Sequence, residues 1–599
     1  MWLDFDWPFS SWVASAPASR YPTSDANSET ITPMPDNVLY YGDNLDVMRR
    51  YIKDETVDLV YLDPPFKSDQ NYNVLFAARD GTEAAAQIKV FEDTWHWDQA
   101  AARAFEETVE QGGKVSEVLQ AFRLFLGTND MLAYLTMMAP RLIELRRVLK
   151  PTGSLYLHCD PTASHYLKLL LDAVFGLENF KNDITWKRTT TKSDYRQGAT
   201  NWPRIHDVIL VYRRDAKGEG TFTQPFAPYT QKYVDAKYGN IDKGGRAYML
   251  DNLTAPGAGS RGHPKYEFLG VIRYWRYNKE KMKKLYAEGR VVQPSPGAVP
   301  RYKRYLDEMP GIALGDVWDD IPAINSQAQE RLGYPTQKPE ALLDRIIQAS
   351  TNEGELVLDP FCGCGTTVAS AERLKRRWIG IDITHLSIAL IKHRLETAHA
   401  GGAKYRVVGE PTTVEDAKVL AESDPYQFQW WALGLVGARG TEQKKGADQG
   451  IDGRLYFHLG DTKTRQLIIS VKAGKVQVSH VRDLLGVIGR EKAEIGVLLS
   501  FEEPTRPMRE EAASAGFFES LWGKHARIQL LTVGELLEGK GIDYPRTSGS
   551  NVTLKAAPRA GAVEADPLHL FDQKEEVVEV EDDQPPPRKK VLPRKKRRR

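Results

Sequence analysis

Apolar segments of two different periods alternate along two stretches of the chain. Residues 57–62 form a short apolar run that is typical of a buried strand, and the apolar positions within 132–149 keep the three-and-four spacing of an amphipathic helix. The same alternation covers 37–215 and returns at 339–381. Strands that alternate with helices predict an α/β fold with a parallel, doubly wound sheet.

This alternation is lost between about 216 and 333, where Gly, Pro, Tyr, Lys and Arg are frequent. We therefore expect an insertion between two parts of one sheet domain. Beyond about residue 405 a further unit with an αβ pattern begins. The predicted segments are an N-terminal arm (1–35), the first part of the sheet domain (36–215), the insertion (216–333), the second part of the sheet domain (334–404), a second αβ domain (405–545) and a charged, disordered tail (546–599).

Composition narrows the class of protein. Of 599 residues, 41% are hydrophobic and 27% are charged, which is typical of a soluble globular protein. No run of eighteen apolar residues predicts a membrane-spanning helix, and the N-terminus lacks the pattern of a secretion signal. Three cysteines cannot form a disulfide framework and suit a reducing compartment, so we expect a cytoplasmic protein without membrane contact.

The net charge of +1 hides a segregated tail. Nine of the twelve residues in 588–599 are Lys or Arg, and six of the nine in 575–583 are acidic. Blocks of like charge cannot bury a core, so we expect this tail to be disordered. Two interpretations stay open, a solubilising tail and a tether to a polyanionic backbone.

A glycine turn follows a predicted buried strand in the second part of the sheet domain. Gly363 and Gly365 let the backbone approach a ligand closely, and Thr366 or Thr367 can cap the next helix. Asp382 ends the following strand, where an acid is placed to accept hydrogen bonds from ribose hydroxyls. Because the third glycine of the dinucleotide fingerprint is missing, a cofactor with adenosine but no pyrophosphate fits better. S-adenosylmethionine is one such cofactor.

The tetrapeptide Asp63-Pro64-Pro65-Phe66 follows the strand predicted at 57–62, at the edge where open α/β sheets bind ligands. Its prolines remove two N–H donors, which leaves the Asp63 carboxylate and the Pro64 carbonyl as acceptors beside an apolar ring. Such a site would hold an exocyclic amino group and stack its ring. Two acceptors stabilise the cationic nitrogen that forms when an amine is alkylated, so we favour this chemistry over a merely stiff turn.

Taken in order, these motifs resemble the amino-group DNA methyltransferases of the β arrangement. In that group the catalytic motif precedes a target recognition domain, and the cofactor motif follows. The resemblance covers about 37–215 and 330–400, and several motifs are similar to those of modification subunits of Type III restriction systems. The further motifs that carry it are Tyr41-Gly42-Asp43, Gly153 to Asp160, Asn182 to Trp186, His206 to Tyr212 and Tyr334 to Pro339.

The resemblance implies a role for each motif. Asp63 and the Pro64 carbonyl would grip the target amine, with Pro65 holding the turn and Phe66 stacking on the base. An Asp at the first position resembles adenine-N6 enzymes, and cytosine-N4 methylation remains the alternative. S-adenosylmethionine would be held by Asp359, Phe361, Gly363, Gly365, Thr366 and Asp382, with Lys338 and Pro339 near its methionine end.

The expected partner is double-stranded DNA, from which the target base must be flipped out to be reached. The insertion is the candidate sequence reader, since its Arg and Lys side chains can contact phosphate or guanine. A homodimer or a separate restriction subunit remain open as further partners. The basic residues that we single out in the insertion are Arg246, Arg261, Lys265, Arg273 and Arg276.

The C-terminal αβ unit resembles the PD-(D/E)xK restriction endonucleases, in which acids and a lysine bind a divalent metal and activate water. Asp452 and Lys472 match that pattern and imply Mg²⁺, whereas Ser470 stands where an acid or Gln is expected. A neutral hydroxyl is a poorer ligand for Mg²⁺. Three interpretations remain, namely a single-chain restriction–modification enzyme that cuts DNA, a DNA-binding relic of that fold, and an unrelated domain.

Overall fold

The structure is a computed structural model. It describes residues 37–65, 97–189, 201–215, 220–255, 262–325, 328–334, 336–398, 402–440, 450–459, 463–545, 551 and 553, together with the backbone of β3 (Phe76–Ala77) and β4 (Glu83–Ala84). The predicted N-terminal arm and Phe66 lie outside the described residues, as does the charged tail apart from residues 551 and 553.

Within these residues, nine strands form a central sheet in the order β16-β6-β7-β5-β2-β17-β18-β1-β19. Neighbouring strands are parallel except where β7 pairs with β5 and β6. The strands are β1 (Val38–Tyr41), β2 (Val57–Leu62), β5 (Leu149–Cys159), β6 (Phe180–Lys187), β7 (His206–Arg213), β16 (Val317–Trp318), β17 (Leu356–Asp359), β18 (Arg377–Asp382) and β19 (Arg406–Val408).

The α/β class is confirmed, but the expectation of a wholly parallel sheet is wrong at β7. A parallel pair needs a crossover connection, usually through a helix. The described part of the connection between β6 and β7 contains no helix, and β7 runs back antiparallel between β5 and β6.

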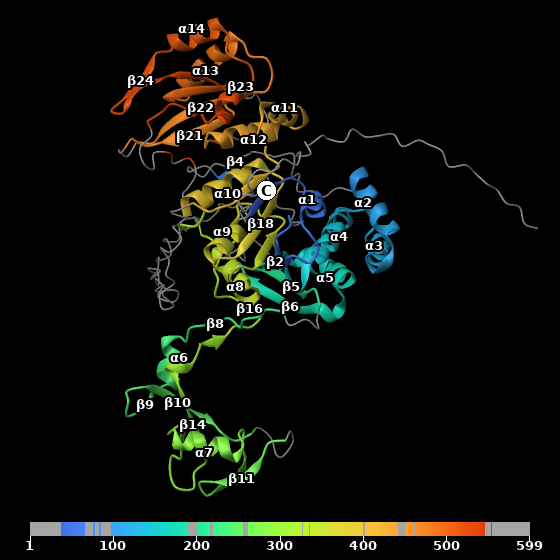
Figure 1. Ribbon diagram of the computed structural model, residues 1–599, viewed down its shortest axis with the longest axis vertical. Helices are drawn as coiled ribbons and strands as arrows, with labels where there is room; N and C mark the ends of the chain where they lie inside the picture. Colours follow the sequence, from blue (N-terminus) through green and yellow to red (C-terminus); the bar gives the residue numbers. More distant parts are fainter. Residues whose placement is uncertain are drawn as a thin grey trace, which may run out of the picture.

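Helices cover both faces of the central sheet (Figure 1). Side chains alternate along β2, so that Val60 and Leu62 pack under one helical layer, and Leu59 and Tyr61 pack under the other. All four side chains are buried, which explains why this strand is apolar apart from Asp58, a buried carboxylate that pairs with Lys150. The first layer contains α1 (Asn44–Tyr51), α2 (Gln99–Glu110), α3 (Gly113–Leu126), α4 (Asp130–Val148) and α5 (Pro161–Phe175), and the second contains α8 (Glu340–Ser350), α9 (Thr366–Arg373) and α10 (His385–Ala398).

The predicted insertion builds a small unit that extends away from the central sheet (Figure 1). Trp275 lies fully buried at its centre against Leu253, Phe268 and Met282. The chain then returns to the central sheet through β16. The elements of the insertion are β8 (Phe226–Ala227), α6 (Gln231–Lys237), β9 (Asn240–Ile241), β10 (Ala247–Asn252), β11 (Lys265–Phe268), β12 (Val271–Tyr274), α7 (Lys279–Ala287), β13 (Val291–Val292), β14 (Arg301–Tyr305) and β15 (Ile312–Ala313).

The C-terminal unit has its own sheet, with the order β20-β21-β22-β23-β26. It contacts the central unit through α12, where Trp430 packs against Leu386 and Cys364, and the backbone N–H of His385 donates to Gln427 Oε1 at 3.1 Å. Its elements are α11 (Val414–Ser423), α12 (Pro425–Leu435), β20 (Arg439–Gly440), β21 (Gly453–Phe457), β22 (Arg465–Lys472), α13 (Val478–Arg490), β23 (Ile495–Ser500), α14 (Arg506–Ser514), β24 (Phe517–Ser520), β25 (Gly523–Ala526), β26 (Ile528–Thr532) and α15 (Val533–Leu537).

Among the described helices, none is both long enough and apolar enough to cross a bilayer.

Candidate active site

Two strands that carry the predicted motifs are neighbours in the central sheet. β2 and β17 pair in parallel, with Val60 opposite Leu358. Parallel strands end at the same edge of a sheet, so Asp63, which follows β2, and Asp359, the last residue of β17, emerge side by side. The structure therefore brings together the predicted amine-binding motif and the predicted cofactor motif, which are almost 300 residues apart in the chain.

Asp63 forms an ion pair with the ammonium group of Lys338. The exposed fractions of the two side chains are only 17% and 13%, so the pair is largely withdrawn from water. Pro64 is buried and Pro65 is half-buried behind the carboxylate. Lys338 directly precedes Pro339, the N-cap residue of α8. The segment that the resemblance places near the methionine end of the cofactor thus reaches the catalytic motif.

The glycine turn is narrow on both sides. Gly363 has φ +50°, and a Cβ there would lie 3.3 Å from the ring of Tyr334. Gly365 has φ +75°, and a Cβ there would lie 2.7 Å from Ile391 Cγ1. Both values are in the left-handed region that favours glycine. Asp382 closes the turn from the next strand, because the backbone N–H of Gly363 donates to Asp382 Oδ2 at 2.9 Å.

Thr366 has a different role from the predicted one. The N-cap of α9 is Gly365, with no side-chain capping bond, so neither threonine of this motif caps the helix. Instead the Thr366 hydroxyl donates to the carbonyl oxygen of Lys338 at 3.3 Å. The buried Arg394 guanidinium donates to Thr366 Oγ1 and to the Cys364 carbonyl, each at 3.2 Å. These bonds tie the glycine turn to the segment that carries Lys338.

Burial changes the acidity of two carboxyl groups at this edge. It raises the pKa of Asp359 to about 7, although the backbone N–H of Phe361 donates to its Oδ1 at 3.0 Å. Burial also raises the pKa of Asp382, against the opposing effect of hydrogen bonds from Thr384 and Gly363. Near neutral pH the Asp359 carboxyl group is therefore present both in its protonated form, which can donate a hydrogen bond, and in its ionised form, which only accepts.

A second cluster beside the cofactor motif was missed from the sequence. Arg141 of α4 donates to Asp43 Oδ2 and to Asn44 Oδ1, both at 2.7 Å, and Asn44 Nδ2 donates to the Pro360 carbonyl at 2.8 Å. Burial lowers the pKa of Arg141 despite the nearby Asp43 carboxylate. An arginine on the apolar stripe of a helix, between Met138 and Leu145, is the signal that could have revealed it.

A buried polar chain flanks Asp63 on its other side. Tyr61 Oη and His158 Nδ1 are 3.0 Å apart, and His158 Nε2 lies 3.3 Å from Asp207 Oδ2. Burial is the largest single effect and tends to raise the pKa of Asp207, but the hydrogen bond with His158 and the nearby charges, Lys338 and Arg188 among them, together lower it. Arg188 completes the chain, 3.0 Å from Asp207 Oδ1. His158 is therefore a hydrogen-bonded structural residue.

The predicted nuclease-like residues also meet. Asp452 Oδ2 accepts hydrogen bonds from the Val471 backbone N–H at 2.7 Å and from the Ser470 hydroxyl at 3.1 Å, and Lys472 Nζ lies 3.7 Å away. Mg²⁺ prefers several oxygen ligands in octahedral geometry. No group of three or more His, Cys, Asp or Glu side chains within the described ranges could hold a metal ion. Of the predicted pattern, Asp452 supplies a carboxylate, whereas Ser470 supplies only a neutral hydroxyl, a poorer ligand for Mg²⁺.

Comparison with protein families agrees with this geometry. A family model described as DNA methylase, N6_N4_Mtase, matches residues 57–393, which is more than half of the chain. A second model, described as restriction endonuclease, matches residues 420–538. The chain belongs to the DNA methylase family, and its C-terminal unit is restriction-endonuclease-like.

Individual relatives and solved structures share limited sequence identity with this chain. The chain is 28% identical to Type II methyltransferase M.EcaI of Enterobacter cloacae over 386 residues, which cover 64% of this chain and 74% of the relative. It is 49% identical to DNA adenine methyltransferase YhdJ of Escherichia coli over 84 residues, 14% of this chain and 28% of that one. A solved M1.HpyAVI–SAM complex is 14% identical, with 59% of this chain and 97% of that chain covered and a TM-score of 0.27.

Proposed function

We propose that this chain transfers a methyl group from S-adenosylmethionine to the N6 amino group of adenine in double-stranded DNA. The observation that carries the proposal is the position of Lys338. Its ammonium group pairs with Asp63, and its backbone carbonyl accepts the hydroxyl of Thr366 in the cofactor motif. A donor bound at the glycine turn and an amine bound at Asp63 would then lie next to each other.

The glycine turn fits a cofactor with an adenosine group. Gly363 and Gly365 have no side chains that would keep a ligand away from the backbone of the turn. The Asp382 carboxylate lies next to the turn, because its Oδ2 accepts a hydrogen bond from the Gly363 N–H. Phe361 adds a partly buried apolar ring. Asp359 is next to it as a buried acid, and Lys338 and Pro339 would lie near the methionine end. When bound, S-adenosylmethionine supplies an electrophilic methyl group.

Asp63 and the Pro64 carbonyl supply the acceptors for the amine. As the nitrogen gains a methyl group it becomes tetrahedral and cationic, and two oxygen acceptors stabilise that charge most in the transition state. Asp63 forms an ion pair with Lys338, and an ionised carboxylate offers only hydrogen-bond acceptors. In this proposal Phe66 stacks on the flipped base, after the duplex has released it.

Adenine is favoured over cytosine as the target. The Asp63 position resembles adenine-N6 enzymes, and the relative YhdJ is named a DNA adenine methyltransferase. The family model covers both N6 and N4 chemistry, so cytosine-N4 methylation is the alternative. The test is incubation of DNA with the full chain and methyl-labelled S-adenosylmethionine, followed by digestion to nucleosides. Label in N6-methyl-2′-deoxyadenosine supports the proposal, and label in N4-methyl-2′-deoxycytidine supports the alternative.

For the C-terminal unit we propose DNA binding without cleavage. Asp452 is largely occupied by donors from its own strand pair, and Ser470 stands where a metal ligand is expected. The experiment is incubation of supercoiled plasmid with the full chain across Mg²⁺, Mn²⁺ and Ca²⁺. Intact plasmid supports the proposal, whereas metal-dependent cutting that is lost in Lys472→Ala would establish a single-chain restriction–modification enzyme.

The expected location and assembly stay predictions. Cys159, Cys362 and Cys364 are free and buried, which suits the reducing cytoplasm. Light scattering of the purified chain tests a homodimer, and co-purification from the native host tests the other open alternative, a separate restriction subunit.

A further inference from the structure

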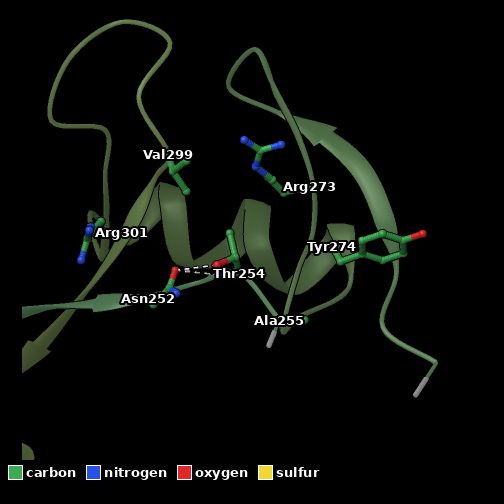
Figure 2. Close-up of a pocket in the computed structure, with 7 residues that line it drawn as sticks. All are labelled: Asn252, Thr254, Ala255, Arg273, Tyr274, Val299 and Arg301. Atoms are coloured by element: carbon green, nitrogen blue, oxygen red, sulfur yellow. Dashed lines mark hydrogen bonds between the residues drawn. The ribbon is translucent and has the colours of Figure 1, made fainter. Parts of the chain in front are cut away.

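A cavity in the insertion unit is lined by several side chains that can donate hydrogen bonds and by no acidic side chain. It lies between the sheet that contains β10 and β14 and the hairpin of β11 and β12, with a volume of about 370 Å³ (Figure 2). Asn252 and Arg301 face each other across the strand pair. Its lining residues are Asn252, Thr254, Ala255, Arg273, Tyr274, Val299 and Arg301.

Most arginines of this unit are used to hold the fold. They pair with nearby carboxylates, and the two-sided pairing of Arg246 removes it as a candidate DNA contact. Arg276 lies 4.0 Å from Asp251, and Arg261 is outside the described residues. The short pairs are Arg246 with Asp307 and Glu308, Arg290 with Glu308, and Arg304 with Asp251.

Arg273 and Arg301 differ from these arginines. Both side chains are exposed, and neither forms an ion pair or a side-chain hydrogen bond with any described residue. The acid next to the lining residue Asn252, Asp251, precedes it on the same strand, so its side chain points to the other face, where it pairs with Arg304. Two positive charges therefore meet at one cavity without a neutralising carboxylate in its lining.

The polar groups around these charges are donors as well. Asn252 Oδ1 already accepts from the Thr254 hydroxyl at 2.7 Å and from the Thr254 backbone N–H at 3.2 Å (Figure 2). The amide of Asn252 thus offers its N–H₂ group to the cavity. A neutral base edge could accept these hydrogen bonds but would leave both guanidinium charges uncompensated, whereas a phosphodiester does both.

We infer that Arg273 and Arg301 clamp the DNA backbone through a phosphodiester group bound in this cavity, with Asn252 as a further donor. The inference rests on the proposed function for the presence of DNA and adds the site and the chemical group. It assigns these two arginines to positioning the duplex, so they act on affinity and register and carry no sequence information.

The test measures binding of the full chain to fluorescent duplexes of several unrelated sequences, by anisotropy at a series of salt concentrations. The variants are Arg273→Ala, Arg301→Ala and their combination. Each neutralised phosphate contributes about 0.9 to the slope of log affinity against log salt. Because the two arginines bind one phosphodiester group, the double variant should lose about 0.9 units of slope. Affinity should fall roughly tenfold for each arginine, equally for all sequences.

Lys283→Ala is the matched control, because it removes one exposed charge from α7 of the same unit without touching the cavity wall. Its slope should stay close to that of the wild type. An unchanged slope in the double variant, or a loss confined to one sequence, would overturn the inference. Methyl transfer by the wild type, measured in parallel, separates the two failures: without it the proposed function fails, whatever the salt slopes show.

Discussion

Asp63 and Lys338 lie 275 residues apart in the chain and form an ion pair at the carboxyl edge of the central sheet. The pair joins the loop after β2 to the segment that precedes α8. Because the Lys338 carbonyl also accepts from Thr366, one short segment contacts both predicted halves of the active site. The account of amine methylation depends on this closeness.

The coupling between Asp63 and Lys338 can be measured directly. In a double-mutant cycle of Asp63→Asn and Lys338→Met, chemical denaturation should give a coupling free energy of about 1–3 kcal/mol, because the pair is mostly withdrawn from water. The exposed pair of Asp46 and Arg50 on α1, 3.0 Å apart, is the control and should couple by less than about 0.5 kcal/mol. Additive effects at Asp63 and Lys338 would mean that the two charges do not interact in solution.

The glycine turn predicts a steric effect that is separable from backbone strain. Gly365→Ala places a methyl group 2.7 Å from Ile391 and should cost about 2–4 kcal/mol of unfolding free energy, together with a large loss of cofactor affinity. Gly354→Ala is the control, because its φ is +80° but the space around it is open. It should cost only about 1 kcal/mol and leave cofactor binding intact. Equal losses in the two variants would argue against a narrow turn.

Asp359 should make stability depend on pH. Its folded-state pKa of about 7 exceeds the ordinary value of 3.8, so folding favours the protonated form. This contribution is complete below about pH 4 and is lost as the pH rises through about 7, with a total of about 4 kcal/mol at most. Asp359→Asn removes it. The unfolding free energy of the variant minus that of the wild type should therefore increase from pH 4 to pH 8, and a difference that stays constant would contradict the assignment.

Arg394 should stabilise the cofactor turn from within the core. It is 1% exposed, and it donates to Glu340 at 2.6 Å as well as to Thr366 and Cys364. Arg394→Met leaves the Glu340 carboxylate without this partner and should cost about 3–5 kcal/mol in thermal or chemical unfolding. Cofactor affinity, measured by calorimetry below the melting temperature, should fall with it. Unchanged affinity would show that the turn keeps its shape without the arginine.

Local sequence patterns were sufficient for much of the fold. The strand predicted at 57–62 is β2, and the helix predicted across 132–149 is α4, because each has a mostly apolar run or stripe. The end of the helix was predicted wrongly, since α4 ends at Val148 and Leu149 already begins β5. The direction of β7 could not be obtained in this way, since strand direction depends on which neighbours a strand joins. Likewise the order of the sheet, with β17 beside β2, came only from the structure.

In the candidate site, too, features with a local sequence pattern could be predicted, whereas contacts between distant residues could not. The motif around Asp63 and the turn around Gly363 have local signatures, so both could be found along the chain. The contact of Arg141 with Asp43 and Asn44 joins residues almost 100 positions apart and has no local signature beyond a charge on an apolar stripe. Which arginines of the insertion stay unpaired depends on where its acids fall in space, and for that reason Arg301 was missed.

Methyl transfer by Asp63→Asn tests the central claim most directly. The variant keeps the size of the side chain but replaces one acceptor oxygen with a donor. With labelled S-adenosylmethionine and DNA, the account predicts a rate at least about 100-fold below that of the wild type, with cofactor affinity within about twofold and with Asp46→Asn fully active. An Asp63→Asn enzyme that methylates DNA at the wild-type rate would contradict it.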